Sequence, residues 1–260
     1  MTSEPKLPTP LHRQAAQAVI DFSISSPVEA VLLVNSCARG TATAESDLDL
    51  ALLIPPELPA ESRLFLERTW QQRYEHDPVF RKLERQSRFA RVHVDFFDGQ
   101  WRPQRWDDGG GPDCFEIEIG NRVAHALPLW EASDAFAHLG AKWLPYYDEA
   151  LRLERLPMVR DACCLNLDRV HSAVARELYF YAFDRLYHAF QELLQAVFMV
   201  RRVYPIAYNK WIREQVEGWL GLPALYADLH SLLEVHRLQS REVENKAEEL
   251  RRLLERWTTG

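Results

Sequence analysis

Residues 31–54 read Val-Leu-Leu-Val-Asn-Ser-Cys-Ala-Arg-Gly-Thr-Ala-Thr-Ala-Glu-Ser-Asp-Leu-Asp-Leu-Ala-Leu-Leu-Ile. Two apolar runs are joined here by a small polar turn, and Asp47 and Asp49 open the second run. In a strand, alternate side chains share a face, so these two aspartates would lie opposite Leu48 and Leu50. Neighbouring carboxylates repel each other unless a cation lies between them. Mg²⁺ prefers such oxygen ligands, usually together with substrate phosphates, so the stretch predicts a metal-nucleotide site.

The same stretch resembles the signature of the nucleotidyltransferase superfamily that includes DNA polymerase beta and the antibiotic nucleotidyltransferases. That signature is an apolar strand, Gly-Ser, a short segment containing Arg-Gly, and Asp-x-Asp opening a second strand. The positions that match it are Ser36, Arg39, Gly40, Asp47 and Asp49.

Asn35 departs from the signature, because the family normally has glycine at that position. Glycine permits positive φ and a close approach of the backbone to phosphate. Asparagine is among the next best residues at positive φ, so we expect the turn to survive.

A third carboxylate, normally on a neighbouring strand, would complete the family's metal site. Residues 91–97 read Arg-Val-His-Val-Asp-Phe-Phe, an alternation typical of a strand with one buried face. Asp95 on this strand is the preferred third ligand. Asp98 is the competing candidate, but it falls in the turn before Gly99.

The resemblance implies transfer of a nucleoside monophosphate, AMP from ATP or the equivalent from another nucleoside triphosphate, to a hydroxyl group. Two Mg²⁺ ions would serve, one held by Asp47 and Asp49 and the other shared with Asp95. Ser36, in the same turn as Asn35, would donate its hydroxyl and neighbouring N–H groups to the terminal phosphates.

Arg39 has two interpretations in this turn. It could neutralise charge on the triphosphate, or it could simply pair with Glu45. The sequence favours neither.

Composition sets the class of protein and of partner. The chain has 260 residues, 27% of them charged and 47% hydrophobic, with a net charge of −7, as in a soluble globular protein. Nucleic-acid-binding proteins normally show a basic patch, whereas the basic residues here are spread among acids. We therefore expect a small-molecule acceptor, no nucleic acid and no membrane. The beginning lacks the apolar stretch of a signal peptide, which favours a cytoplasmic location.

The pattern of apolar residues predicts an α+β fold with two domains. Residues 1–128 would form a mixed sheet with helices on one side, and residues 129–260 an all-helical bundle. The elements expected in the first domain are a helix over 10–24, a strand on each side of the turn, helical residues 60–87 with a break at Pro78, the strand 91–97 and an edge strand over 122–127. The helices expected in the second are 141–156, 159–203, 209–219, 223–237 and 240–257.

Two residues of the predicted bundle are candidates for the site. Glu177 begins a polar stripe that could face the cleft, where the antibiotic enzymes place a carboxylate as general base; the competing interpretation is a solvated helix face. Lys210 could reach the phosphates, with Trp211 stacking on a base, or this Lys-Trp pair could belong to a helix start packed on the bundle.

The acceptor class rests on residues 98–118. Tryptophans and carboxylates interleave there and would suit a polyamine-like substrate such as an aminoglycoside; the alternative is an acidic surface loop. The residues concerned are Trp101, Trp106, Asp107, Asp108, Asp113, Glu116 and Glu118.

Two rival functions remain open. The chain could transfer the nucleotide to a macromolecule, by AMPylation of protein or addition to RNA as in toxin-antitoxin nucleotidyltransferases. It could also be a degenerate, non-catalytic nucleotide-binding module, which the departure at Asn35 would allow.

Overall fold

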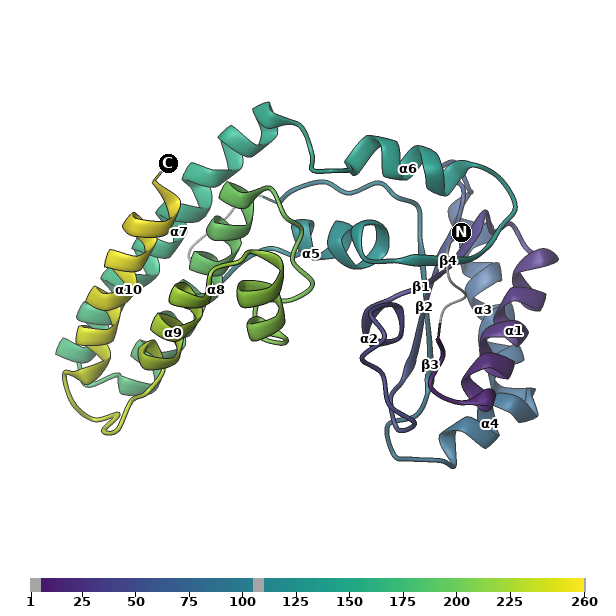
Figure 1. Cartoon of the computed structure of the whole chain (residues 1–260), viewed down its shortest axis with the longest axis horizontal. Helices are drawn as coiled ribbons and strands as arrows, with labels where there is room; N and C mark the ends of the chain where they lie inside the picture. The colour runs from purple at the N-terminus through teal and green to yellow at the C-terminus, as the bar shows by residue number, and fades with distance from the viewer. Residues whose placement is uncertain (1–5, 105–109, 260) are drawn as a thin grey trace. The chain divides into compact units, whose positions relative to one another are not determined.

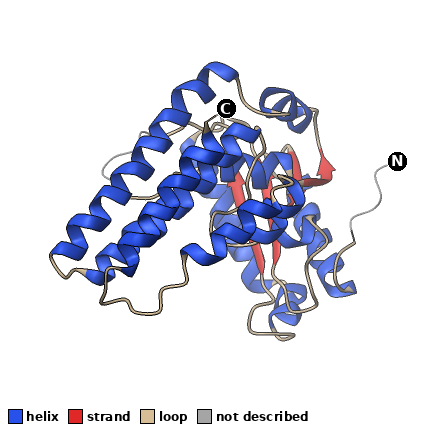
Figure 2. Ribbon diagram, turned by 60° about the vertical axis from the view of Figure 1, so that its left-hand side comes forward, coloured by secondary structure: helices blue, strands red, loops and turns tan. Residues whose placement is uncertain are grey.

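The computed structural model describes residues 6–104 and 110–259, and it divides the chain into two compact units. Unit 1 holds the described residues up to 101 together with 119–144, and unit 2 holds those of 102–118 together with 145–259. A mixed sheet lies in unit 1 and packed helices make up most of unit 2, so the predicted α+β class is confirmed (Figure 2).

The elements of unit 1 are α1 (Pro10–Ile24), β1 (Ala30–Leu33), α2 (Asn35–Ala38), β2 (Leu48–Leu53), α3 (Ala60–His76), α4 (Pro78–Glu84), β3 (Val92–Phe97), the π-helix η1 (Gly120–Ala124), β4 (Leu127–Glu131) and α6 (Ala135–Trp143). Those of unit 2 are α7 (Glu149–Ala175), α8 (Tyr179–Arg201), the π-helix η2 (Glu214–Trp219), α9 (Pro223–Leu232) and α10 (Glu242–Thr258). The short helix α5 (Phe115–Ile119) ends where the chain passes from unit 2 to unit 1.

The sheet has the strand order β3-β2-β1-β4. β1 pairs antiparallel with both β2 and β4, whereas β2 and β3 run parallel. Apolar side chains of one face, such as Leu48 and Leu50, pack with residues of α1, α3 and α4. Figure 1 shows these helices beside the sheet. On the other face, Ala51 and Leu53 pack with Phe136 and Leu139 of α6. The sheet therefore has helix on both faces, although the helices were expected on one side only.

Local signals set the helices around the sheet. Thr9 caps α1 by accepting a hydrogen bond from the His12 backbone N–H, and Pro10 opens that helix. The buried His12 ring also lies 3.0 Å from the Ser46 carbonyl oxygen, which fixes the residue before Asp47. The predicted break at Pro78 is confirmed, since α3 ends at His76 and α4 begins at Pro78.

The predicted edge strand lies later than expected. Residues 120–124 form η1, and β4 covers Leu127–Glu131 at the edge of the sheet. Pro128, placed at the predicted domain boundary, lies inside β4, where the register shifts. Proline is tolerated there because an edge strand need not donate to a second neighbour. The division into units consequently differs from the predicted boundary at residue 128.

Unit 2 is built on α7, α8 and α10, which pack against one another (Figure 1). The predicted core stripe of α8 is confirmed, because Leu186, Phe190, Leu193 and Val197 are all buried. The predicted single helix over 159–203 is wrong: α7 ends at Ala175 and α8 begins at Tyr179.

Glu177 lies in that break with a φ of 59°. A left-handed residue cannot continue a right-handed helix, so the chain breaks between α7 and α8.

Pro157, expected to separate two helices, lies inside α7. Proline has no backbone N–H, so the carbonyl of Leu153, four residues earlier, has no helical hydrogen bond. Both residues are exposed, so water can bond to that carbonyl.

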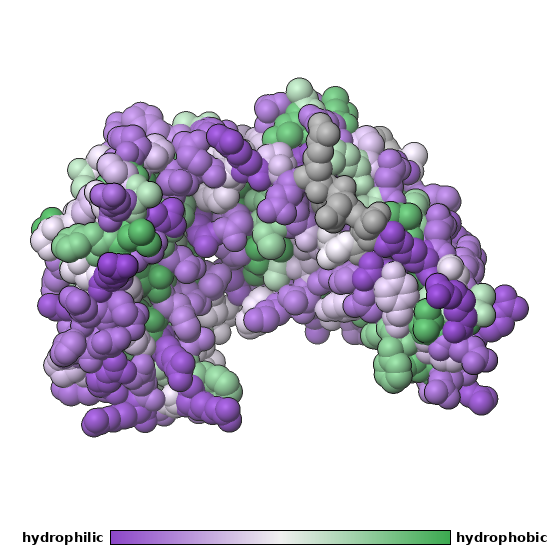
Figure 3. Space-filling view, turned by 180° about the vertical axis from the view of Figure 1, so that it is seen from behind, coloured by the Kyte–Doolittle hydropathy of each residue, from purple (hydrophilic) through white to green (hydrophobic). Residues whose placement is uncertain are grey.

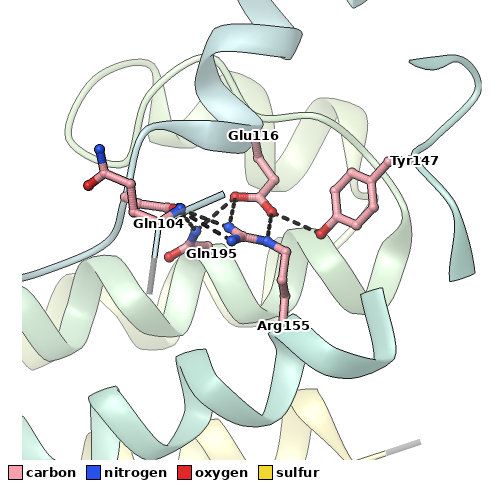
Figure 4. Close-up of polar contacts among 6 residues, drawn as sticks. Gln104, Glu116, Tyr147, Arg155 and Gln195 are labelled. Atoms are coloured by element: carbon pink, nitrogen blue, oxygen red, sulfur yellow. Dashed lines mark hydrogen bonds and ion pairs between the residues drawn. The ribbon is translucent and has the colours of Figure 1, made fainter. Parts of the chain in front are cut away.

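A buried ion-pair network holds the start of α5 and the residues just before it onto the helices of unit 2 (Figure 4). The Arg155 guanidinium donates to both Glu116 carboxylate oxygens at 2.9 Å and to Asp113 Oδ1 at 2.9 Å. Gln195 Nε2 donates to the same two acids, and Tyr147 Oη donates to Glu116 Oε1 at 2.8 Å. Residues 119–144 belong to unit 1, with Glu116 just before them and Tyr147 just after them. The hydrogen bond between Tyr147 and Glu116 therefore joins the two points at which the chain leaves unit 2 and returns to it.

Hydrophilic side chains dominate the face drawn in Figure 3, consistent with the proportion of charged residues. None of the described helices combines the length and apolar character required to cross a bilayer.

We expect Arg155→Met to lower the free energy of unfolding of unit 2 by about 3–5 kcal/mol, because Asp113 and Glu116 would be left buried without their cation. Urea unfolding followed by circular dichroism measures this loss. Arg251→Met is the matched control, since its partner Asp168 is mostly exposed, and it should cost far less. Equal losses in the two variants would contradict the role assigned to the network.

Candidate active site

The candidate site begins at the turn between β1 and α2. Asn35 adopts a φ of 55°, so the prediction that asparagine would accept the left-handed conformation here is confirmed. The Val34 backbone N–H donates to the Asp49 carbonyl oxygen at 3.1 Å, and the Asn35 side chain is near enough to lower the pKa of the Asp49 carboxyl. The turn and the second aspartate of the motif are therefore neighbours.

Asp47 precedes β2 and is held by two backbone contacts. Its Oδ1 accepts a hydrogen bond from the Arg91 backbone N–H at 3.2 Å, and its carbonyl accepts one from Cys37 Sγ at 3.4 Å. His93 Nε2 lies 3.8 Å from the same Oδ1. Asp47 thus links the turn to the start of β3.

Asp95 lies on the same sheet face as Asp49. In the parallel register, Asp49 is opposite His93 and Ala51 is opposite Asp95. Asp98 lies beyond the strand and accepts a hydrogen bond from the Gln100 N–H within its own turn. Asp95 therefore shares the sheet face of Asp49, and its role as the third carboxylate stays a prediction.

The electrostatics link the three acids. Burial raises the pKa of Asp49 above its ordinary value, and the charges of Asp47 and Asp95 raise it further. The Asn35 hydrogen bond and the neighbouring His93 act in the opposite direction. An ionised Asp49 is costly here without a compensating positive charge.

The donors suit a hard divalent ion in their chemistry, since all three are carboxylates. Asp47 and Asp95 keep 39% and 70% of their side chains exposed, so their oxygens are accessible. Across residues 6–104 and 110–259, however, no three acidic, histidine or cysteine side chains converge closely enough to hold one ion. The Asp47 carboxylate accepts a hydrogen bond from the Arg91 backbone N–H, and the Asp95 carboxylate faces the Arg122 guanidinium. Binding an ion would therefore require rotation of both aspartate side chains.

A groove of about 550 Å³ in unit 1 runs along β3 beside this cluster. It includes Asp95 and His93, and its charged lining also includes Arg63, Glu67 and Arg91. Both signs of charge are therefore present next to the third carboxylate.

The remaining turn residues lie on α2 or directly after it. Ser36 is half-buried in the first turn of α2, and its carbonyl accepts hydrogen bonds from Thr41. Arg39 follows α2 and is half-buried, and Gly40 adopts a φ of 71°. Both interpretations of Arg39 stay open.

Glu177 and Lys210 belong to unit 2, and both are exposed. Their contacts with a nucleotide held on unit 1 remain predictions. In the predicted acceptor loop, Trp106, Asp107 and Asp108 lie outside the described residues.

Two acids of that loop have a different role from the one expected. Asp113 and Glu116 are used by Arg155 inside unit 2, so they are not available to attract a polycationic substrate.

Two polar residues beside the candidate acids, and one buried acid in unit 2, were not predicted from the sequence. His93 and Arg122 lie beside the acids; the alternation of residues 91–97 could have placed His93 on the face of Asp95, whereas nothing local marked Arg122. Glu192 of α8 is fully buried, with its carboxylate bonded by Asn166 Nδ2, and burial raises its pKa to about 7.

Comparison with solved structures gives a likeness that is distant in sequence. No family model matches the chain, and no curated protein matches its sequence. The crystal structure of a nucleotidyltransferase-like protein from Exiguobacterium sibiricum is similar, with a TM-score of 0.49 and 14% identity, covering 95% of this chain and 75% of that one. A likeness this distant says nothing about activity.

Substitutions at Asn35 test the conformation of the turn. Both Asn35→Gly and Asn35→Ala lose the side-chain contact with Asp49, but only alanine is strained at a φ of 55°. We expect the alanine variant to be less stable than the glycine variant by about 1 kcal/mol, measured by urea unfolding. Equal stability would show that the left-handed turn is not maintained in solution.

Proposed function

We propose that the chain is a magnesium-dependent nucleotidyltransferase that transfers a nucleoside monophosphate, AMP from ATP by resemblance, to a hydroxyl of a small molecule. The observation that carries this proposal is the electrostatic grouping of Asp47, Asp49 and Asp95 on one sheet face, beside the left-handed turn at Asn35. A partly buried carboxylate with two more acids near it is a candidate functional site, because its charge needs a compensating cation.

The chain's own residues divide the work. Asp47 and Asp49 would hold the ion that neutralises the triphosphate, and Asp95 would share the ion that activates the acceptor. When bound, such ions supply charge neutralisation and a lowered pKa of the acceptor hydroxyl. Ser36 and the N–H groups of its turn would contact the terminal phosphates.

Asn35 has a positioning role in this proposal. Its side chain contacts the Asp49 carboxylate, while its backbone forms the turn. One residue therefore couples the phosphate-binding loop to the acid that would hold the ion.

The groove beside Asp95 is the proposed place of the acceptor. Because its lining carries arginines as well as acids, it offers a hydroxyl-bearing molecule both donors and acceptors. An aminoglycoside-like acceptor stays within the proposal, but the acids of the groove, rather than Asp113 and Glu116, would have to attract it.

Exchange of single carboxylates for amides tests the assignment. We expect Asp49→Asn and Asp95→Asn to lower turnover about a thousandfold or more, because each removes charge from the ion site while retaining shape. Asp98→Asn, three residues beyond Asp95, is the matched control and should retain activity. The measurement is pyrophosphate release from labelled ATP and Mg²⁺ with a panel of aminoglycosides, lincosamides and simpler alcohols.

The same assay separates the rival functions. Labelling of the protein itself or of added RNA would support a macromolecular acceptor. Triphosphate binding without turnover on any acceptor would support a non-catalytic module. Equal activity of the Asp95 and Asp98 variants would contradict the assignment of the third carboxylate.

A further inference from the structure

Arg122 lies beside the third carboxylate on a rare type of helix. It belongs to the π-helix η1, which follows directly on α5. Its Nη2 lies 3.5 Å from Asp95 Oδ2, and its guanidinium carbon is 5.7 Å from the centre of the Phe97 ring. π-Helical turns occur frequently at functional sites, and here one directs a cation to an acid of the candidate site.

The two members of the pair differ in exposure. The Arg122 side chain is 19% exposed, whereas that of Asp95 is 70% exposed. The guanidinium is thus held by its surroundings, while the carboxylate is free to turn toward another cation. An ion pair with so exposed a partner contributes little stability, so a divalent ion with twice the charge could replace it.

We propose that Arg122 pairs with Asp95 in the absence of metal, and that a divalent ion displaces its guanidinium from Asp95 so that it can bind the anionic nucleotide. This inference rests on the proposed function, because it concerns the same carboxylates. It also explains how three acids can be near one another without converging on a common point: one of them is already neutralised.

Arginine is suited to both states of this exchange. Its planar guanidinium remains charged even when burial lowers its pKa, as it does for Arg122. It binds carboxylate and phosphate oxygens by the same fork of N–H groups. The guanidinium that binds Asp95 can therefore also bind a phosphate group.

The exchange predicts effects of opposite sign for one substitution. In Arg122→Ala, Mn²⁺ alone should bind about threefold more tightly than in the unaltered chain, because no guanidinium competes for Asp95. In the presence of saturating Mn²⁺, a non-hydrolysable ATP analogue should bind about tenfold more weakly, because a phosphate partner is lost. Isothermal titration calorimetry on the full chain measures both affinities without turnover.

Two further variants separate the exchange from a general effect of charge. Arg63→Ala removes a cation that lines the same groove but pairs with Glu67 and the Phe96 carbonyl, and it should leave Mn²⁺ affinity unchanged. Asp95→Asn combined with Arg122→Ala should abolish the gain in Mn²⁺ affinity. Misfolding cannot strengthen one affinity while weakening the other.

Each outcome is decisive. Unchanged or weakened Mn²⁺ binding in Arg122→Ala, an equal gain in Arg63→Ala, or unaltered nucleotide affinity would overturn the exchange and leave the proposed function standing. Absence of Mn²⁺ and nucleotide binding by the unaltered chain would overturn both.

Discussion

The antiparallel pairing of β1 with β2 is the constraint on which the candidate site depends. Because Leu33 is opposite Leu50, the end of β1 and the start of β2 lie together. The Val34 N–H bonds the Asp49 carbonyl, and the next residue begins the turn that touches the Asp49 carboxylate. A slip of one residue would move every alternate side chain to the other face and place Asp49 in the apolar core.

That constraint is enforced by packing on both faces of the sheet. Leu48, Leu50 and Leu52 are buried with the helices on one side, so Asp49 must lie on the other. There, Ala51 and Leu53 continue the apolar face and leave the acid at its end, partly withdrawn from water. Burial and nearby acids raise its pKa together. The core therefore holds a carboxylate in a place that favours a cation.

The parts of the fold that follow from local patterns could be predicted from the sequence. Alternation placed β2 and β3, periodicity placed α1 and the core stripe of α8, and the asparagine of the turn indicated a left-handed residue. Pro78 marked a real break, whereas Pro128 and Pro157 did not, because an edge strand and an exposed helix face tolerate proline. The break at Glu177 carries neither proline nor glycine, so no local signal could reveal it.

Long-range pairing explains what the sequence did not reveal. Arg155 pairs with Asp113 and Glu116, which lie about forty residues earlier in the sequence. This pairing places their segment in unit 2, whereas its composition suggested an acidic surface loop. In the same way, Arg122 reaches Asp95 across 27 residues. Charge partners at such separations have no periodicity, so only the fold identifies them.

The most direct test of the site is diffraction from crystals grown with Mn²⁺ and a non-hydrolysable ATP analogue, with data collected at the manganese absorption edge. We predict an anomalous peak coordinated by the Asp47 and Asp49 carboxylates beside the triphosphate, with Asp95 turned away from Arg122. A nucleotide and metal bound elsewhere, with these three carboxylates still directed to their present partners, would contradict it.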